Sequence, residues 1–138
     1  MSKGHILFVD DDETVLFLLK KLLQQEEYEC HFAQSGEEAL DKLSRLPIDV
    51  LISDMRMPDM DGFQLLSIVK ERHPLVVRII LSGYLQVQTI LAVINQIGVY
   101  RYLTKPFMVN EDTRQVLVDA LKEARRLKRE TPERQTQA

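Results

Sequence analysis

The sequence has little cysteine, no tryptophan and no long apolar run. Cys30 is the single cysteine among 138 residues, so the chain cannot form an internal disulfide, which suits a reducing compartment. The apolar stretch near the start is cut off by three aspartates and is too short for a signal sequence or a membrane span. We therefore expect a cytoplasmic protein that does not contact a membrane.

Excess positive charge is also lacking. The net charge of −3 provides no general attraction to nucleic acid, so direct nucleic-acid binding is not expected. The composition, with 45% hydrophobic and 28% charged residues, is that of an ordinary globular protein. The length fits one domain. We predict a domain over residues 1–130 and a polar tail or truncated linker over residues 131–138.

Short apolar runs alternate along the chain with segments of helical period. The runs, which we interpret as strands, are Ile6–Val9, Tyr28–Ala33, Ile48–Ser53, Val76–Leu81 and Val99–Leu103. Helical spacing or capping signals follow each run, at residues 15–22, 35–46, 63–72, 87–97 and 111–129. Continuous apolar runs are typical of parallel strands buried on both faces, and helices connect such strands. The pattern predicts a doubly wound α/β fold with five βα units.

Acidic residues follow two of these predicted strands. Asp10 and Asp11 come directly after the first run, and Asp54 comes after the third. Chemistry in an open parallel sheet gathers at the carboxyl ends of the strands, and carboxylates that meet there require a cation such as Mg²⁺. The alternative is that Asp10–Asp12 only cap the next helix, but that alternative leaves Asp54 without a role.

Ser82 and Lys105 follow the fourth and fifth predicted strands. Taken singly, a serine before a glycine is usually a turn residue and a lysine is usually solvated. Together with the acids, however, they place a group suited to phosphate at each of four strand ends that should face one crevice. The joint pattern favours a phosphoryl-handling site.

Four motifs carry a resemblance to a known family: ILFVDDD, DVLISDMRMPDMDG, RIILSG and YRYLTKPF. With them the chain resembles the receiver domains of two-component response regulators, over about residues 4 to 128. The resemblance implies a flavodoxin-like parallel sheet of five strands in the order 2-1-3-4-5. It implies a signalling domain that undergoes phosphoryl transfer rather than an enzyme with its own substrate.

The resemblance also implies roles for the acidic residues. Asp54 would be the phosphoacceptor. Asp10, Asp11 and Asp54 would hold Mg²⁺ together with the backbone carbonyl of Arg56. We further hypothesise that Arg56 and Tyr84 screen the acyl phosphate from water, although both could be ordinary surface residues.

Further roles are implied at the ends of the last two strands. Lys105 would pair with the phosphoryl group, and its bond to Pro106 would be cis. Ser82 would bond a phosphoryl oxygen, and Tyr102 would turn inward on activation. This switch would repack the surface made by the fourth helix, the fifth strand and the fifth helix.

The implied partners are a sensor histidine kinase or phosphotransfer protein on one side, and an output domain or effector protein on the other. A homodimer through the switching surface is a further expectation. The apolar segment Leu85–Ile97 either belongs to that surface or is simply buried, and the basic run near Arg125 is either a signalling helix or a solvated face. The chain is either excised from a longer regulator, as the tail suggests, or a stand-alone receiver.

Three other classes fit parts of the pattern. A Mg²⁺-dependent phosphatase with an aspartyl nucleophile would use Asp10 and Asp12, but then Asp54 has no role. A flavodoxin-like cofactor binder would need a loop of small residues after the first strand, where this chain has acids that repel phosphate. A scaffold related to receivers would not need the complete set of site residues.

Overall fold

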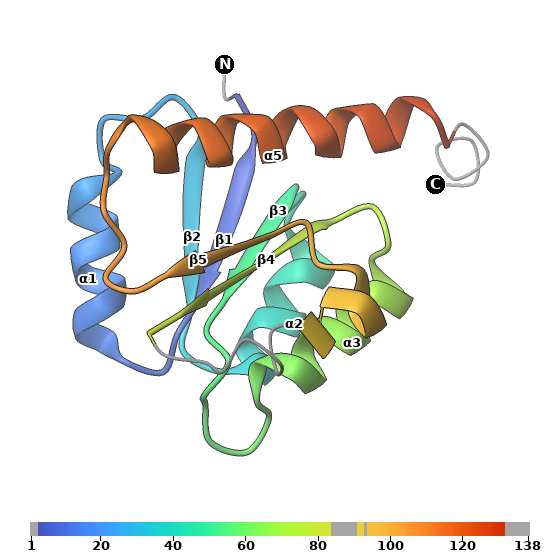
Figure 1. The fold of residues 1–138 in the computed structure, drawn as a ribbon, viewed down its shortest axis with the longest axis horizontal. Coiled ribbons are helices and arrows are strands. Elements are labelled where there is room, and N and C mark those ends of the chain that lie inside the picture. The colour runs from blue at the N-terminus through green and yellow to red at the C-terminus, as the bar shows by residue number, and fades with distance from the viewer. Residues whose placement is uncertain (1–2, 84–90, 93, 132–138) are drawn as a thin grey trace.

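The fold rests on one parallel five-stranded sheet (Figure 1). The computed structural model describes residues 3–83, 91–92 and 94–131. The strands lie in the order β2-β1-β3-β4-β5, and every neighbouring pair is parallel. Their bounds are β1 His5–Val9, β2 Glu29–Ala33, β3 Val50–Ser53, β4 Val77–Ser82 and β5 Arg101–Thr104. The predicted flavodoxin-like α/β fold is therefore confirmed.

Helices cover both faces of the sheet, because strand side chains alternate between two apolar layers. Ile6 and Phe8 point into the layer shared with α1 and α5, whereas Leu7 and Val9 point into the layer shared with α2 and α3. The helices are α1 Glu13–Leu22, α2 Gly36–Arg45, α3 Gly62–Arg72 and α5 Glu111–Arg129, with a π-helical turn η1 Ile94–Gly98 before β5. Figure 1 shows α5 crossing one side of the sheet.

Capping residues set where the helices begin. Ser35 accepts a hydrogen bond from the Glu38 N–H and begins α2 as predicted. Asn110 and Thr113 form a reciprocal capping box at the start of α5, which spans the predicted residues. Strands β3 and β5 begin later than their apolar runs. Before β3, the Ile48 N–H bonds the nearby Leu46 carbonyl instead of a neighbouring strand.

The predicted fourth helix lies largely outside the described residues, which omit 84–90 and 93. Tyr84, Leu85 and Val93 fall in this part, as do residues 132–138 of the predicted tail. Gly98 adopts a positive φ of 76° and closes η1, as its position predicts. Within the described residues, no helix is long and apolar enough to cross a membrane.

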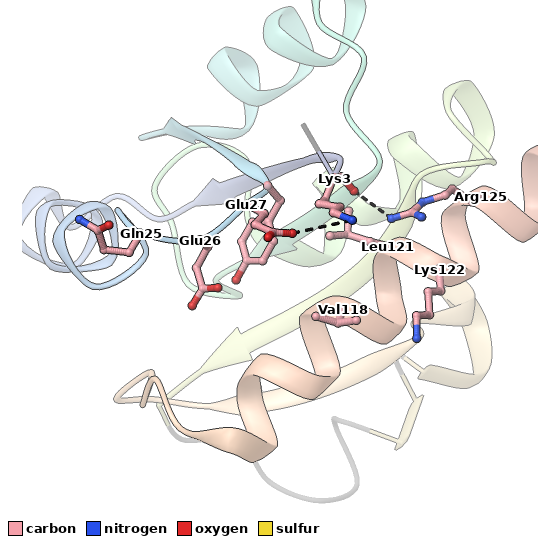
Figure 2. A pocket seen from close by; sticks show the side chains of 9 residues that line it. Lys3, Gln25, Glu26, Glu27, Val118, Leu121, Lys122 and Arg125 are labelled. Carbon is pink, nitrogen blue, oxygen red and sulfur yellow. Dashed lines mark hydrogen bonds and ion pairs between the residues drawn. The ribbon is translucent and has the colours of Figure 1, made fainter. Parts of the chain in front are cut away.

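A hollow of about 490 Å³ lies at the amino ends of the strands, between α5 and the turn before β2 (Figure 2). Several of its charged groups already have partners: Lys3 pairs with Glu27 at 3.8 Å, and Arg125 donates to the Lys3 carbonyl at 2.9 Å. The acidic residues singled out in the sequence lie at the opposite, carboxyl end of the sheet.

Candidate functional site

The sheet brings the carboxylates of Asp10, Asp11 and Asp54 together. Strands β1 and β3 are neighbours and pair Val9 with Ser53, so the residues that follow them lie side by side at one edge. One carboxylate oxygen from each aspartate lies within 4.8 Å of the others. The convergence expected from the sequence is therefore present.

The three aspartates differ in burial. Asp10 is 3% exposed and Asp54 is 7% exposed, whereas Asp11 is exposed. Helix capping falls to Asp12, whose carboxylate accepts the Thr14 N–H at 2.9 Å. Asp10 accepts the Asp12 N–H at 2.9 Å, but its other oxygen faces the cluster. The capping alternative thus accounts for Asp12 and not for the pair Asp10 and Asp54.

Lys105 bridges the two buried carboxylates. Its Nζ lies 2.6 Å from Asp10 Oδ2 and 3.5 Å from Asp54 Oδ1. The Lys105 backbone N–H donates to the carbonyl of Ser82 at 2.9 Å, and the Lys105–Pro106 peptide bond is cis. Ser82 is 2% exposed, so it lies in the same buried end of the sheet.

The electrostatics of the cluster balance burial against pairing. Burial raises the pKa of Asp54, and Asp10 raises it further, although Lys105 acts in the opposite direction. Burial lowers the pKa of Lys105, but the hydrogen bond to Asp10 and the charges of both aspartates outweigh burial, so the net shift is upward. Lys105 therefore stays a cation, and the pKa of Asp54 lies above its ordinary value.

The backbone of Asp54 is held by close packing. The Ser53 hydroxyl donates to the Asp54 carbonyl at 2.9 Å. A Cβ added to Gly62 would lie 2.3 Å from the same carbonyl oxygen, so only glycine fits at the start of α3. The helix predicted from the sequence begins at residue 63, one residue after Gly62, and the prediction did not include this contact. The Asp-Gly pair at 61–62 is a signal for a tight turn, but it does not reveal which backbone atom lies opposite.

The remaining predicted site residues lie around the cluster. Arg56 is exposed beside an open hollow of about 470 Å³ that Asp11 and Asp61 also line. Tyr102 is partly buried and packs against the apolar layer shared with α2 and α3. Tyr84 lies outside the described residues, so its predicted position at the mouth has no structural counterpart here.

The donor set fits a hard divalent cation. All three side chains offer carboxylate oxygens, which Mg²⁺ prefers, and the exposure of Asp11 leaves room for waters on the ion. The site is chemically suited to hold phosphate oxygens between such a cation and Lys105.

Curated relatives match most of this chain. The transcriptional regulator NtrC of Klebsiella pneumoniae is 38% identical over 111 residues, which are 80% of this chain and 24% of that protein. The transcriptional regulatory protein GlrR of Escherichia coli is 40% identical over 122 residues, which are 88% of this chain and 27% of that protein. The chain thus spans about a quarter of the length of these relatives.

Solved structures match the fold. The signal receiver domain of an HD domain-containing protein from Pseudomonas fluorescens is 35% identical, with a TM-score of 0.78 over 88% of this chain and 97% of that one. A CheY-like response regulator receiver domain from Methanospirillum hungatei is 29% identical, with a TM-score of 0.79 over 89% and 97% of the two chains. The family description "Response regulator receiver domain" matches residues 6–121. The chain belongs to the response regulator receiver domain family, whose members are signalling domains of two-component systems rather than enzymes.

Proposed function

We propose that this receiver domain accepts a phosphoryl group on Asp54 from a sensor histidine kinase or a phosphotransfer protein. The observation that carries the proposal is the placement of Lys105 between two buried carboxylates, of which Asp54 has the raised pKa. The carboxylate is positioned to act as the nucleophile, and the neighbouring cation offsets the charge on the incoming phosphoryl oxygens.

The transfer forms a bond between an Asp54 carboxylate oxygen and phosphorus while the phosphorus–nitrogen bond of the donor phosphohistidine breaks. The donor imidazole leaves with the electron pair of that bond and takes up a proton. Asp10, Asp11, Asp54 and the Arg56 carbonyl would hold Mg²⁺, which supplies charge neutralisation when bound. Lys105 would follow the phosphoryl group and release Asp10 for the ion.

The phosphoryl group adds charge and three strong acceptors next to Ser82. The Ser82 hydroxyl would bond one of them, and the movement would let the half-buried Tyr102 on β5 turn further inward. Since β5 leads directly to α5, this repacking would change the surface that controls an output domain, an effector protein or a second copy of the chain. The relatives NtrC and GlrR are transcriptional regulators, which supports an output domain that regulates transcription.

An apolar groove of about 320 Å³ runs beside the site, between α1 and the segment after β5. Leu18, Pro106 and Phe107 line the groove, and Lys105 closes its end toward the cluster. Leu18 and its neighbour Phe17 are 52% and 58% exposed. Because this exposed apolar surface adjoins Lys105 of the acidic cluster, we assign the groove to docking of the phosphodonor. A cytoplasmic location is consistent with this role and stays a prediction.

Intact mass spectrometry after incubation with Mg²⁺ and acetyl phosphate tests the proposal. We expect wild type to gain one phosphoryl mass, and the Asp54→Asn variant to gain none. Asp61→Asn, which changes a neighbouring loop carboxylate, is the matched control and should gain the mass as wild type does. Equal labelling of wild type and Asp54→Asn would overturn the proposal.

A further inference from the structure

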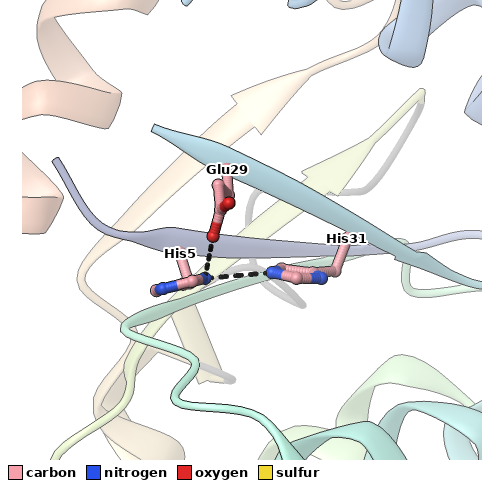
Figure 3. Close-up of side chains that lie close together, drawn as sticks. All are labelled: His5, Glu29 and His31. Atoms are coloured by element: carbon pink, nitrogen blue, oxygen red, sulfur yellow. Dashed lines mark hydrogen bonds and ion pairs between the residues drawn. The ribbon is translucent and has the colours of Figure 1, made fainter. Parts of the chain in front are cut away.

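A second group of metal-ligating side chains lies at the other end of the sheet. His5 begins β1, and Glu29 begins β2, in direct register with it. His31 follows two residues later on β2 and lies on the same face as His5 and Glu29. Figure 3 shows the three side chains pointing toward one another from two neighbouring strands.

The ligand atoms lie close enough together to share an ion. His5 Nδ1 lies 3.0 Å from a Glu29 carboxylate oxygen and 3.1 Å from His31 Nε2. All three ligand atoms lie within 4.8 Å of one another. A tetrahedral Zn²⁺ with ligands at about 2.0–2.1 Å holds neighbouring ligand atoms about 3.3 Å apart. The two separations from His5 lie within a few tenths of an ångström of that value, and the third, between Glu29 and His31, is at most 4.8 Å.

We propose that His5, Glu29 and His31 form a binding site for a divalent ion of the zinc class, with water completing the coordination. Two imidazoles and a carboxylate suit Zn²⁺ and similar first-row ions rather than Mg²⁺, which prefers oxygen ligands. The acidic cluster at the carboxyl ends of the strands offers oxygen alone. The domain thus has two cation sites of different chemistry at opposite ends of one sheet.

The surroundings of the cluster favour an ordered site. The His5 and His31 rings stack with centroids 5.3 Å apart, which limits their rotation. Two further charged groups face the cluster: Lys42 of α2, which is engaged with the Phe32 carbonyl, and Asp49, which accepts the His5 N–H at 2.8 Å.

An ion at this site would join the edge strand to the rest of the sheet. Strand β2 lies at the edge and pairs only with β1 among the described strands. Since His5 belongs to β1 and the other two ligands to β2, one ion would cross-link the two strands. An ion that binds the folded chain and not the unfolded chain raises the midpoint of thermal unfolding.

A titration of the full chain with Zn²⁺, in saturating Mg²⁺, tests the site through the ring nitrogen signals of its histidines. We expect the signals of His5 and His31 to shift together and to saturate at one equivalent of Zn²⁺, while those of His73 on the α3 side stay unchanged. Shifts confined to the backbone signals of Asp10 and Asp54 would place Zn²⁺ in the acidic cluster instead and would overturn the proposal.

Affinity measurements on variants make the assignment specific. Competition with a chromophoric chelator should show that His31→Gln and Glu29→Gln each weaken Zn²⁺ binding by roughly tenfold or more. Loss of a residue that only hydrogen-bonds a metal ligand already weakens binding by about this factor, so loss of a ligand should cost at least as much. Glu29 is largely exposed, so its substitution should leave the fold intact. His73→Gln is the matched control and should bind Zn²⁺ like wild type. Unchanged affinity in Glu29→Gln and His31→Gln would show that the three side chains form only a hydrogen-bonded cluster.

Discussion

At the residue scale, Lys105 is the cation that stabilises the two buried carboxylates of the candidate site in the absence of metal. Its Nζ contacts both Asp10 and Asp54, and these are among the few buried charged residues of the described chain. An exposed ion pair contributes less than about 1 kcal/mol, whereas breaking a fully buried pair costs about 3–5 kcal/mol. Lys105 is partly buried, so its contribution should lie between these limits.

We therefore expect Lys105→Met to lower the free energy of unfolding by about 1–3 kcal/mol in the absence of metal, because two carboxylates then face each other without a cation. Mg²⁺ should restore most of the loss, and the variant should gain more stability from Mg²⁺ than wild type does. Urea unfolding with and without Mg²⁺ measures both effects. Lys122→Met, at an exposed position on α5, should change neither quantity. An unchanged metal-free stability of Lys105→Met would contradict the bridging role.

At the element scale, the start of α3 is fixed by contact with the backbone that follows β3. A Cβ at Gly62 would approach the Asp54 carbonyl oxygen and the Met55 Cα to 2.3 and 2.8 Å, and both are backbone atoms that cannot move alone. Gly62→Ala should cost about 2–3 kcal/mol, the upper part of the usual range for single substitutions.

Chemical denaturation of Gly62→Ala against Gly83→Ala checks this contact. A Cβ at Gly83 would meet only the Lys105 side chain, at 3.8 Å, which is ordinary contact. Gly83→Ala should therefore stay within about 0.5 kcal/mol of wild type. Equal stability of the two variants would mean that the backbone at Asp54 yields to the added methyl group.

Helix α1 presents the apolar groove beside the site. Leu18→Arg places a charge on this groove at a half-exposed position, so the fold should tolerate it. Phosphoryl transfer from a phosphorylated histidine kinase that labels wild type should slow at least tenfold, about 1.4 kcal/mol, whereas labelling by acetyl phosphate should not change. Val118→Arg on α5, away from the groove, is the control. Slower labelling by both donors would show damage to the site rather than to docking.

The elements also show what the sequence could and could not reveal. Continuous apolar runs located β1, β3 and β4, and the shorter, interrupted patterns at Tyr28–Ala33 and Val99–Leu103 located β2 and β5. Apolar residues at helical spacing located α5. The runs began too early at Ile48 and Val99, since apolar side chains also fill the turns that lead into a strand. Hydrophobicity reports burial, whereas a strand requires ladder hydrogen bonds, which depend on the neighbouring chain segment.

At the scale of the whole molecule, the order of strands explains how the site was predictable. Residues that follow neighbouring parallel strands meet at one edge, so the position of Asp10 and Asp54 followed once the order 2-1-3-4-5 was inferred. The bridging geometry of Lys105 and the packing of Gly62 on Asp54 did not follow, because each depends on distances between side chains that no spacing encodes. The His5, Glu29 and His31 cluster was missed for the same reason, since single histidines in strands carry no distinctive pattern.

Two groups of possible metal ligands thus lie at opposite ends of the parallel sheet. Carboxylates and an ammonium group gather at the carboxyl ends of the strands, and imidazoles with one carboxylate gather at the amino ends. The phosphoryl proposal depends on the first group alone, so its test is independent of whether Zn²⁺ binds at the second.

Locating the phosphoryl group on a single residue tests the central claim most directly. After labelling with acetyl phosphate and Mg²⁺, the acyl phosphate can be reduced with borohydride and the modified residue identified by fragmentation of its peptide. The account predicts a modification at Asp54 and at no other carboxylate. A modification at Asp10, as the aspartyl-phosphatase alternative requires, would contradict it.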